Sequence, residues 1–318
     1  LSVVLAEGIA GRVLEEYGAV IRFRHDLIRD AIYEDLPLSV RQGLHREAGQ
    51  RLAQTGAPAL QVAEQLARGA GQGDAEAIGW LTRAAREAAA RSPDIAASLL
   101  GRAAGLMAPA DPGRDRLLAE RASSLMVSGR IADTLAACRS LLDRDLDPQV
   151  DGAVRICLGR ALLAEGQVRD ALQELEQAGS SPALPGAERA AARAWAAFAR
   201  VSLGDLDGAA ASAEQARSAA ASAGDHLTVS VAMTTLARVS ESRGHLRDAL
   251  QITDEAVHLA DESPGRLGHR YPIRATRGHI LIELDRPEEA RSALGAGMRI
   301  SEESGVRWPL SIYQVFLA

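Results

Sequence analysis

The chain has 318 residues, of which 36 are basic and 42 acidic, for a net charge of −6; 47% are apolar but only 3% aromatic. Every basic residue is arginine, neither lysine nor asparagine occurs, and 62 positions are alanine, which indicates GC-rich coding and favours helix. The lack of lysine excludes a Walker-type phosphate loop, a Schiff-base enzyme and a lysine general base in this chain. The acidic balance argues against a sequence-independent DNA or membrane surface.

The first 56 residues predict a piece distinct from the rest of the chain. A helical stretch that closes over residues 14–18 precedes an alternating, β-branched run at 19–23 that predicts a short strand. Amphipathic helices are predicted over 26–36 and 40–52. This order is typical of the remnant of a winged-helix-like domain. Because the chain starts at Leu1 and shows neither a signal peptide nor a spanning segment, we expect a cytoplasmic fragment of a longer protein.

A unit made of a helix, a tight turn and a second helix recurs six times in the rest of the chain. Its turn residues are spaced by 38, 37, 38, 40 and 41 positions: Arg91, Gly129, Gly166, Gly204, Gly244 and Asp285. A small residue follows five positions after each turn: Ala96, Thr134, Ala171, Ala209, Ala249 and Ala290. Glycine suits a helix that ends in a left-handed residue, which predicts tight turns at these positions.

Two further rows of small residues keep the same phase. Seven positions before each turn lie Ala84, Ala122, Gly159, Ala197, Ala237 and Gly278. Twelve positions after each turn lie five small residues and one leucine: Ala103, Leu141, Ala178, Ala216, Ala256 and Gly297. Alanine is common in this chain, but agreement over three rows exceeds what its abundance produces. The rows predict that the two helices of each unit cross closely.

This pattern resembles the tetratricopeptide repeat, although only Trp80 stands at the family's aromatic position and the period exceeds 34. The resemblance implies an all-α, right-handed solenoid of about six helix pairs over residues 57–305, with helices of about 11 to 18 residues. Breaks between units are predicted at 108–112, 145–148, 180–185 and 263–265. Residues 306–318 predict the first helix of a truncated further repeat, with a large apolar face that nothing covers, so we expect the natural chain to continue.

The segment from Phe23 through Arg24 and His25 to Leu36, followed by Arg41 and His45, carries a more specific likeness. It resembles the segment that joins the ATPase module to the helical repeats in large ATP-binding LuxR-type bacterial regulators, the group that includes the maltose regulator. Residues 80–85 and 93–100 resemble the same group.

This resemblance places residues 1–56 at the end of the ATPase-linker module, and it confines ATP to a module upstream of this chain. It implies that the repeats sense a small inducer or a protein partner and relay that event to oligomerisation and DNA binding by other domains. The alternative is a stand-alone adaptor that binds a protein or peptide partner.

Catalytic, metal and cofactor sites are not predicted in this chain. Cys138 and Cys157 lack metal-ligand spacing and are expected to be reduced, buried thiols. His25 and His45 lack a third ligand, and the remaining histidines form no HExxH or comparable cluster: His226, His245, His258, His269 and His279. Since no nucleophile, base and orienting group occur together, we expect no enzymatic activity from this chain.

The repeat geometry predicts where a partner would bind. The first helices of such repeats line the concave surface, and the residue six positions before each turn points into it. We call the resulting set the concave row: Ala85, Ser123, Arg160, Phe198, Arg238 and His279. Two arginines flanking an aromatic ring suit an acidic peptide or an anionic small molecule. The alternative is solvated side chains on an unoccupied groove. Neither nucleic acid nor membrane contact is expected, and self-association is possible.

Overall fold

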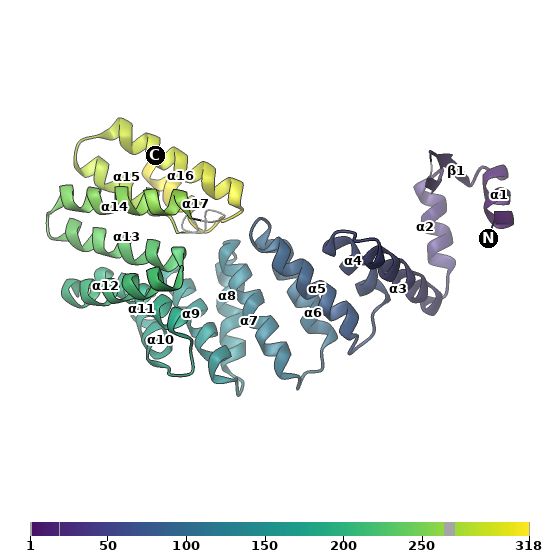
Figure 1. Ribbon diagram of the computed structural model, residues 1–318, viewed down its shortest axis with the longest axis horizontal. Coiled ribbons are helices and arrows are strands. Elements are labelled where there is room, and N and C mark those ends of the chain that lie inside the picture. The colour runs from purple at the N-terminus through teal and green to yellow at the C-terminus, as the bar shows by residue number, and fades with distance from the viewer. Residues whose placement is uncertain (1, 19, 264–270, 318) are drawn as a thin grey trace. The chain divides into compact units, whose positions relative to one another are not determined.

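The computed structural model describes residues 2–18, 20–263 and 271–317, and most of them are helical (Figure 1). The elements in chain order are α1 (Ser2–Ala10), β1 (Leu14–Tyr17), β2 (Val20–Phe23), α2 (Asp26–Asp35), α3 (Leu38–Gln54), α4 (Ala59–Gly69), α5 (Ala75–Ala88), α6 (Pro93–Leu106), α7 (Pro112–Val127), α8 (Ile131–Leu142), α9 (Pro148–Ala164), α10 (Val168–Ser180), α11 (Gly186–Ser202), α12 (Leu206–Ala223), α13 (His226–Ser242), α14 (Leu246–Glu262), α15 (Ile273–Glu283), α16 (Pro287–Ser304) and α17 (Leu310–Leu317). The chain divides into two compact units, residues 1–81 and 82–318. His269 and most of the predicted break at 263–265 lie outside the described residues.

The first unit contains a hairpin that the sequence predicts only in part. The strand predicted at 19–23 is found as β2, but the prediction of a helix end over 14–18 is wrong, because Leu14–Tyr17 form β1. The two strands are antiparallel, with Leu14 opposite Phe23. A lone strand leaves its backbone groups without partners, and β1 supplies them. Glu15 accepts a hydrogen bond from Arg22 across the pair at 2.6 Å.

Helices α3 and α4 form a packed pair in the first unit. They pack against each other at Gly49, where a Cβ would lie 2.6 Å from the Leu66 side chain. Tyr33 and Gln65 bind the two ring nitrogens of His45 at 2.7 Å each, which accounts for this histidine without a metal. Helix α4 packs on α3 and so belongs to the first unit. The boundary between the two compact units therefore falls after residue 81 and not after residue 56. The assignment of domains to 1–56, 57–305 and 306–318 stays a prediction.

The second unit is a helical solenoid of repeats, as predicted. Consecutive helices from α6 to α16 pack on their neighbours in chain order, and each helix pair closes through one tight turn (Figure 1). The predicted left-handed turns are confirmed at Gly129, Gly166, Gly204 and Gly244, with φ between 76° and 84°. Asp285 takes the same conformation at φ 57°, which aspartate tolerates better than most residues. Arg91 does not adopt it.

The three rows of small residues are buried throughout the solenoid. At two crossings the first-helix residue is glycine, and a leucine sixteen positions later fills the space. A Cβ on Gly159 would lie 2.5 Å from Leu175 Cγ, and one on Gly278 would lie 2.6 Å from Leu294 Cγ. Where the first-helix residue is alanine, three of the four residues sixteen positions later are smaller: Cys138, Ala213 and Thr253. The volumes at the crossing are therefore matched pair by pair.

The C-terminal segment, residues 305–317, is covered more than its sequence predicts. Tyr313 is only 3% exposed and packs against Gly297, while Trp308 packs against two core clusters of the solenoid. The prediction of an apolar face that nothing covers is wrong for these two side chains, because Gly297 leaves room for the tyrosine ring. Val315 keeps 73% of its surface exposed.

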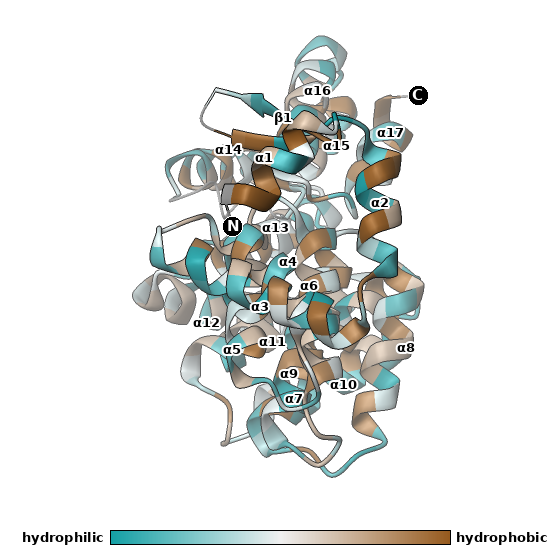
Figure 2. Cartoon of the chain, turned by 90° about the vertical axis from the view of Figure 1, so that its right-hand side faces the viewer, coloured by the Kyte–Doolittle hydropathy of each residue, from teal (hydrophilic) through white to brown (hydrophobic). Residues whose placement is uncertain are grey.

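Hydropathy along the described helices rises at the two ends of the chain. Figure 2 shows α1 and α17 as mostly hydrophobic ribbons among helices of mixed character. In α1, Val3 and Val4 are each 68% exposed. None of the helices in the described residues combines the length and the hydropathy needed to cross a bilayer.

The crossing at Gly159 generates a stability prediction. Gly159→Ala should lower the free energy of unfolding by about 1 to 3 kcal/mol, because the new methyl group must displace Leu175 in a packed core. Chemical denaturation followed by circular dichroism measures the change. Adding Leu175→Thr, which copies the Ala237 and Thr253 pair, should recover part of the loss.

Gly105→Ala is the matched control for this substitution. Gly105 also lies inside a helix, α6, but a Cβ there meets nothing within 4 Å. This variant should be neutral or more stable by up to about 1 kcal/mol, since alanine restricts the unfolded chain. Equal effects of the two substitutions would show that helix propensity, and not the crossing, decides the result.

Candidate functional site

Four aromatic side chains from distant parts of the second unit form one cluster. Trp195 and Phe198 lie on α11, Tyr271 precedes α15, and Trp308 lies between α16 and α17. Ring centres are 6.4 Å apart for Trp195 and Phe198, 5.3 Å for Trp195 and Tyr271, and 6.0 Å for Tyr271 and Trp308. Most of these rings meet edge to face, the arrangement that the ring quadrupole favours. We call these four residues the aromatic cluster.

Two arginines of the concave row stack on this cluster. The Arg160 guanidinium, on α9, lies 5.1 Å from the centre of the Trp195 ring, and that of Arg238, on α13, lies 5.6 Å from Phe198. Such contacts stabilise by about 0.5 to 2 kcal/mol, the most where water is excluded. The structure therefore brings Arg160, Phe198 and Arg238 together from three successive first helices.

The cluster also holds polar atoms without protein partners. Arg238 Nε and the Trp308 indole Nε1 are buried, and neither has a hydrogen-bond partner among the described residues. A buried donor left unsatisfied costs about 1 to 3 kcal/mol, so a ligand that accepts from these atoms would recover free energy. The arrangement favours an acceptor group placed next to an aromatic surface.

The other two candidate binding residues of the concave row, Ser123 and His279, lie on either side of these three in chain order. On α15, His279 Nδ1 is 2.8 Å from Glu241 Oε1 and its ring centre is 5.2 Å from that of Phe316. Ser123, on α7, is exposed and its hydroxyl reaches the Cys157 thiol. Neither residue touches the aromatic cluster, so the structure unites three of the five candidate side chains.

His279 belongs to a group that proximity alone allows as a metal site. Its ligand atoms and those of Glu241 and Glu283 lie within 4.8 Å of one another. The contact of 2.8 Å between His279 and Glu241 has the length of a hydrogen bond, and Glu283 is exposed. A hydrogen bond between His279 and Glu241 accounts for this arrangement, so we assign no metal to it.

The two cysteines lie in one core cluster of the solenoid. Cys138 and Cys157 are both buried, on α8 and α9. A hydrogen bond with Cys157, together with burial, raises the pKa of Cys138. A buried thiol with a raised pKa is a poor nucleophile and metal ligand.

The C-terminal segment reaches the cluster across the solenoid. The Arg307 amide donates to the carbonyl of Val127, at the end of α7, at 3.2 Å. A Cβ on Gly129 would lie 3.3 Å from the Trp308 amide, so the close approach requires a glycine in that turn. The chain thus places one of its own tryptophans against Tyr271, within the aromatic cluster.

Three members of the cluster are absent from the sequence prediction: Trp195, Tyr271 and Trp308. Trp195 lies one helical turn before Phe198, so a search of the same helix face would have found it. The scarcity of aromatic residues was a second signal, since only ten occur in the chain. Tyr271 and Trp308 lie outside the repeat phase, and no local pattern points to their partners.

The fold has known relatives, although no family model and no curated protein matches the sequence. A tetratricopeptide repeat protein from Parabacteroides merdae aligns with a TM-score of 0.56 at 14% identity, over 87% of this chain and 97% of that one. A Rap protein complexed with competence and sporulation factor aligns with a TM-score of 0.55 at 13% identity, over 92% and 91%. These likenesses show a tetratricopeptide-like fold.

A weaker likeness concerns a signal transduction ATPase with a tetratricopeptide repeat sensor, from Pyrococcus horikoshii. It is 13% identical and aligns over 98% of this chain and 42% of that one, with a TM-score of 0.43.

Burial of the cluster generates a prediction about pH. Burial raises the pKa of Tyr271 above the ordinary value of 10.0, although the charge of Arg238 opposes the shift. The folded protein therefore holds the phenol proton more tightly than the unfolded chain does. Its contribution to stability is complete below about pH 10 and is lost as the pH rises further. The free energy of unfolding should fall less steeply above pH 10 in Tyr271→Phe than in the parent chain.

The chain suits this measurement because it has no lysine to titrate in the same range. Denaturation curves at several pH values between 9 and about 11.5 give the slopes. Tyr17→Phe is the control, since Tyr17 is 69% exposed in the first unit. Identical slopes for the parent and Tyr271→Phe would contradict the assignment.

Proposed function

We propose that the second unit is a signal-sensing, protein-binding repeat region whose ligand is held by Arg160, Arg238 and the aromatic cluster. The single observation that supports the proposal is the pair of guanidinium groups stacked on the buried Trp195 ring and the half-buried Phe198 ring, beside donors that have no hydrogen-bond partner among the described residues. We further propose that this region belongs to a bacterial transcriptional regulator of the large ATP-binding LuxR type. It would couple ligand binding to oligomerisation and DNA binding by domains outside this chain.

The contacts of Trp308 define the chemistry that the site accepts. This side chain lies 6.0 Å from Tyr271 and comes from a segment outside regular secondary structure. A peptide with an aromatic residue next to a carboxylate would make the same ring contacts and accept hydrogen bonds from the guanidinium groups. A small anionic inducer would use the same arginines. The proposal assigns neither catalysis nor a cofactor to this chain.

The shared fold is compatible with such a role without demonstrating it. The Rap protein that aligns with this chain was determined in complex with competence and sporulation factor. At 13% identity the likeness shows the fold alone. The proposal therefore depends on the arginines and rings of this chain.

A short acidic peptide tests the site. In the full-length Trp308→Ala variant, a labelled synthetic peptide of alternating tryptophan and glutamate should bind, because the variant vacates the place of the indole and the guanidinium groups can donate to the carboxylates. Fluorescence anisotropy measures the affinity. Replacing Arg160 and Arg238 together by glutamine in this background should weaken binding about tenfold or more, since the charged donors to the peptide carboxylates are lost.

Arg139→Gln together with Arg247→Gln is the control, because these two arginines are exposed, on α8 and α14, and their joint loss changes the net charge equally. Circular dichroism establishes that each variant is folded. Equal affinity in the presence and absence of the two arginines would remove the proposed site. The regulator assignment is tested separately by reading the gene: a GxxxxGK[ST] loop upstream and a helix-turn-helix downstream are expected.

A further inference from the structure

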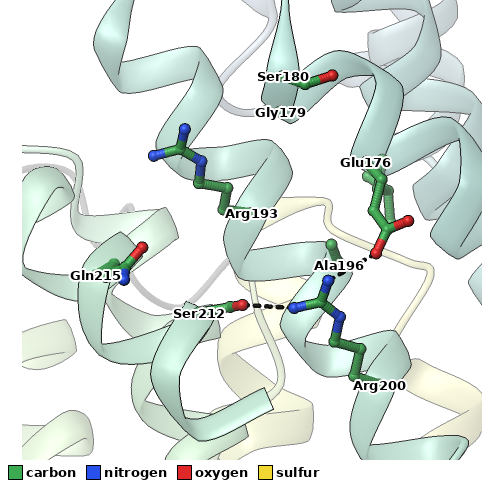
Figure 3. Close-up of a pocket in the computed structure, with 9 residues that line it drawn as sticks. Glu176, Gly179, Ser180, Arg193, Ala196, Arg200, Ser212 and Gln215 are labelled. Atoms are coloured by element: carbon green, nitrogen blue, oxygen red, sulfur yellow. Dashed lines mark hydrogen bonds and ion pairs between the residues drawn. The ribbon is translucent and has the colours of Figure 1, made fainter. Parts of the chain in front are cut away.

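The face of α11 opposite the aromatic cluster carries a hollow of its own. Two adjoining depressions lie over α11: one of about 330 Å³ between α10 and α12, and one of about 360 Å³ between α11 and α12. Arg193 and Gln215 line both, so we treat the two as one trough; Figure 3 shows the first depression with these two side chains. Small residues line it and leave the space open, among them Gly179, Ala196 and Ala216. We call this feature the outer trough.

Other repeats show how an arginine at the position of Arg193 is neutralised. Arginine occurs eleven positions before three of the turns, at Arg155, Arg193 and Arg274. Arg155 binds Asp151 and Glu174, each at 2.7 Å, and also donates to Gln177. Arg274 binds Asp261 at 2.8 Å. In both cases the protein supplies the carboxylate that neutralises the guanidinium.

Around Arg193 the equivalent acids are missing. The positions that correspond to Asp151 and Glu174 are Arg189 and Ser212, while the glutamine is retained as Gln215. Arg193 is exposed, and no carboxylate lies within ion-pair distance of it anywhere in the described chain. The trough thus has the arginine and the amide of the Arg155 site without its two carboxylates.

The neighbouring arginine is already occupied. Arg200 donates to Ser212 Oγ and to Glu176 at 2.7 Å each, as the dashed lines in Figure 3 show, whereas no such line reaches Arg193. Arg189 uses one guanidinium nitrogen to bind the carbonyl of Leu184 and keeps its charge. With three arginines and a single glutamate, the trough is positive on a chain of net charge −6.

We propose that the outer trough binds an acidic peptide segment of a partner protein, whose carboxylates take the places that Asp151 and Glu174 fill at Arg155. Arg193 and Arg189 would donate to these carboxylates, and the Gln215 amide would add a neutral donor. The occupant is argued from charge complementarity and from the matching site in the same solenoid. The trough lies on a different face from the site under Proposed function, and neither proposal requires the other.

A labelled peptide of six glutamates tests the trough in the full-length protein. We expect saturable binding at low ionic strength, weakened about tenfold or more by Arg193→Gln. Supplying the missing acids within the chain, as Arg189→Asp with Ser212→Glu, should close the site. The Arg155 site predicts that this double variant stays folded, and a melt followed by circular dichroism checks it.

Three controls separate the possible outcomes. Arg139→Gln removes an equal charge elsewhere and should leave binding unchanged, as should Arg160→Gln with Arg238→Gln, which affect only the opposite face. A peptide of six glutamines should not bind. Inorganic phosphate should compete only weakly. Binding that Arg139→Gln weakens as much as Arg193→Gln does would overturn the proposal, and so would binding that survives in the self-filled variant or tight phosphate binding without peptide binding.

Discussion

The close crossing of two helices at one small residue is the constraint on which the second unit depends. Where the first helix carries glycine, as at Gly159 and Gly278, a leucine of the second helix enters the space; where it carries alanine, the partner is usually smaller. A crossing fixed at one point also fixes the rotation of the first helix about its axis. Residues six positions before the turn therefore share one face, and residues eleven before it lie near the opposite face. Both candidate binding sites follow from that rotation.

Sequence patterns predicted what is local and missed what depends on distant partners. Turns, small-residue rows and helix lengths each leave a signal within one repeat, so they were available without a structure. Leu14–Tyr17 has no such signal, because its strand exists only through pairing with β2. Arg160, Phe198 and Arg238 share a repeat position and were found, whereas Tyr271 and Trp308 reach them from outside the phase. The outer trough was not predicted from the sequence, because recognising it requires comparing two helices at once. Arg189 on α11 and Ser212 on α12 replace the carboxylates that neutralise Arg155.

Helix α11 contributes residues to both candidate binding sites, and the physical interactions at the two sites differ. Toward Trp195 and Phe198 its neighbours are rings and partly desolvated guanidinium groups, where cation–π attraction is strong. Toward Arg193 the surroundings are solvated, so binding there would depend on charge and on salt concentration. If a ligand on either face shifted α11, the two affinities would change by the same factor, since coupling between binding sites is reciprocal. The helix is thus the element through which two signals would meet.

The hydrogen bond between Arg307 and Val127 differs in kind from the rest of the solenoid. Stacked repeats touch mainly their neighbours and fold through contacts that are close in sequence. This bond instead joins the last helix pair to the second turn of the array, so forming it requires closure of a loop that includes most of the unit. Contacts of such high sequence separation are the costly ones to close while a chain folds. The C-terminal segment therefore ties the end of the array to one of its early turns, so losing the bond would remove a long-range constraint that nearest-neighbour packing does not supply.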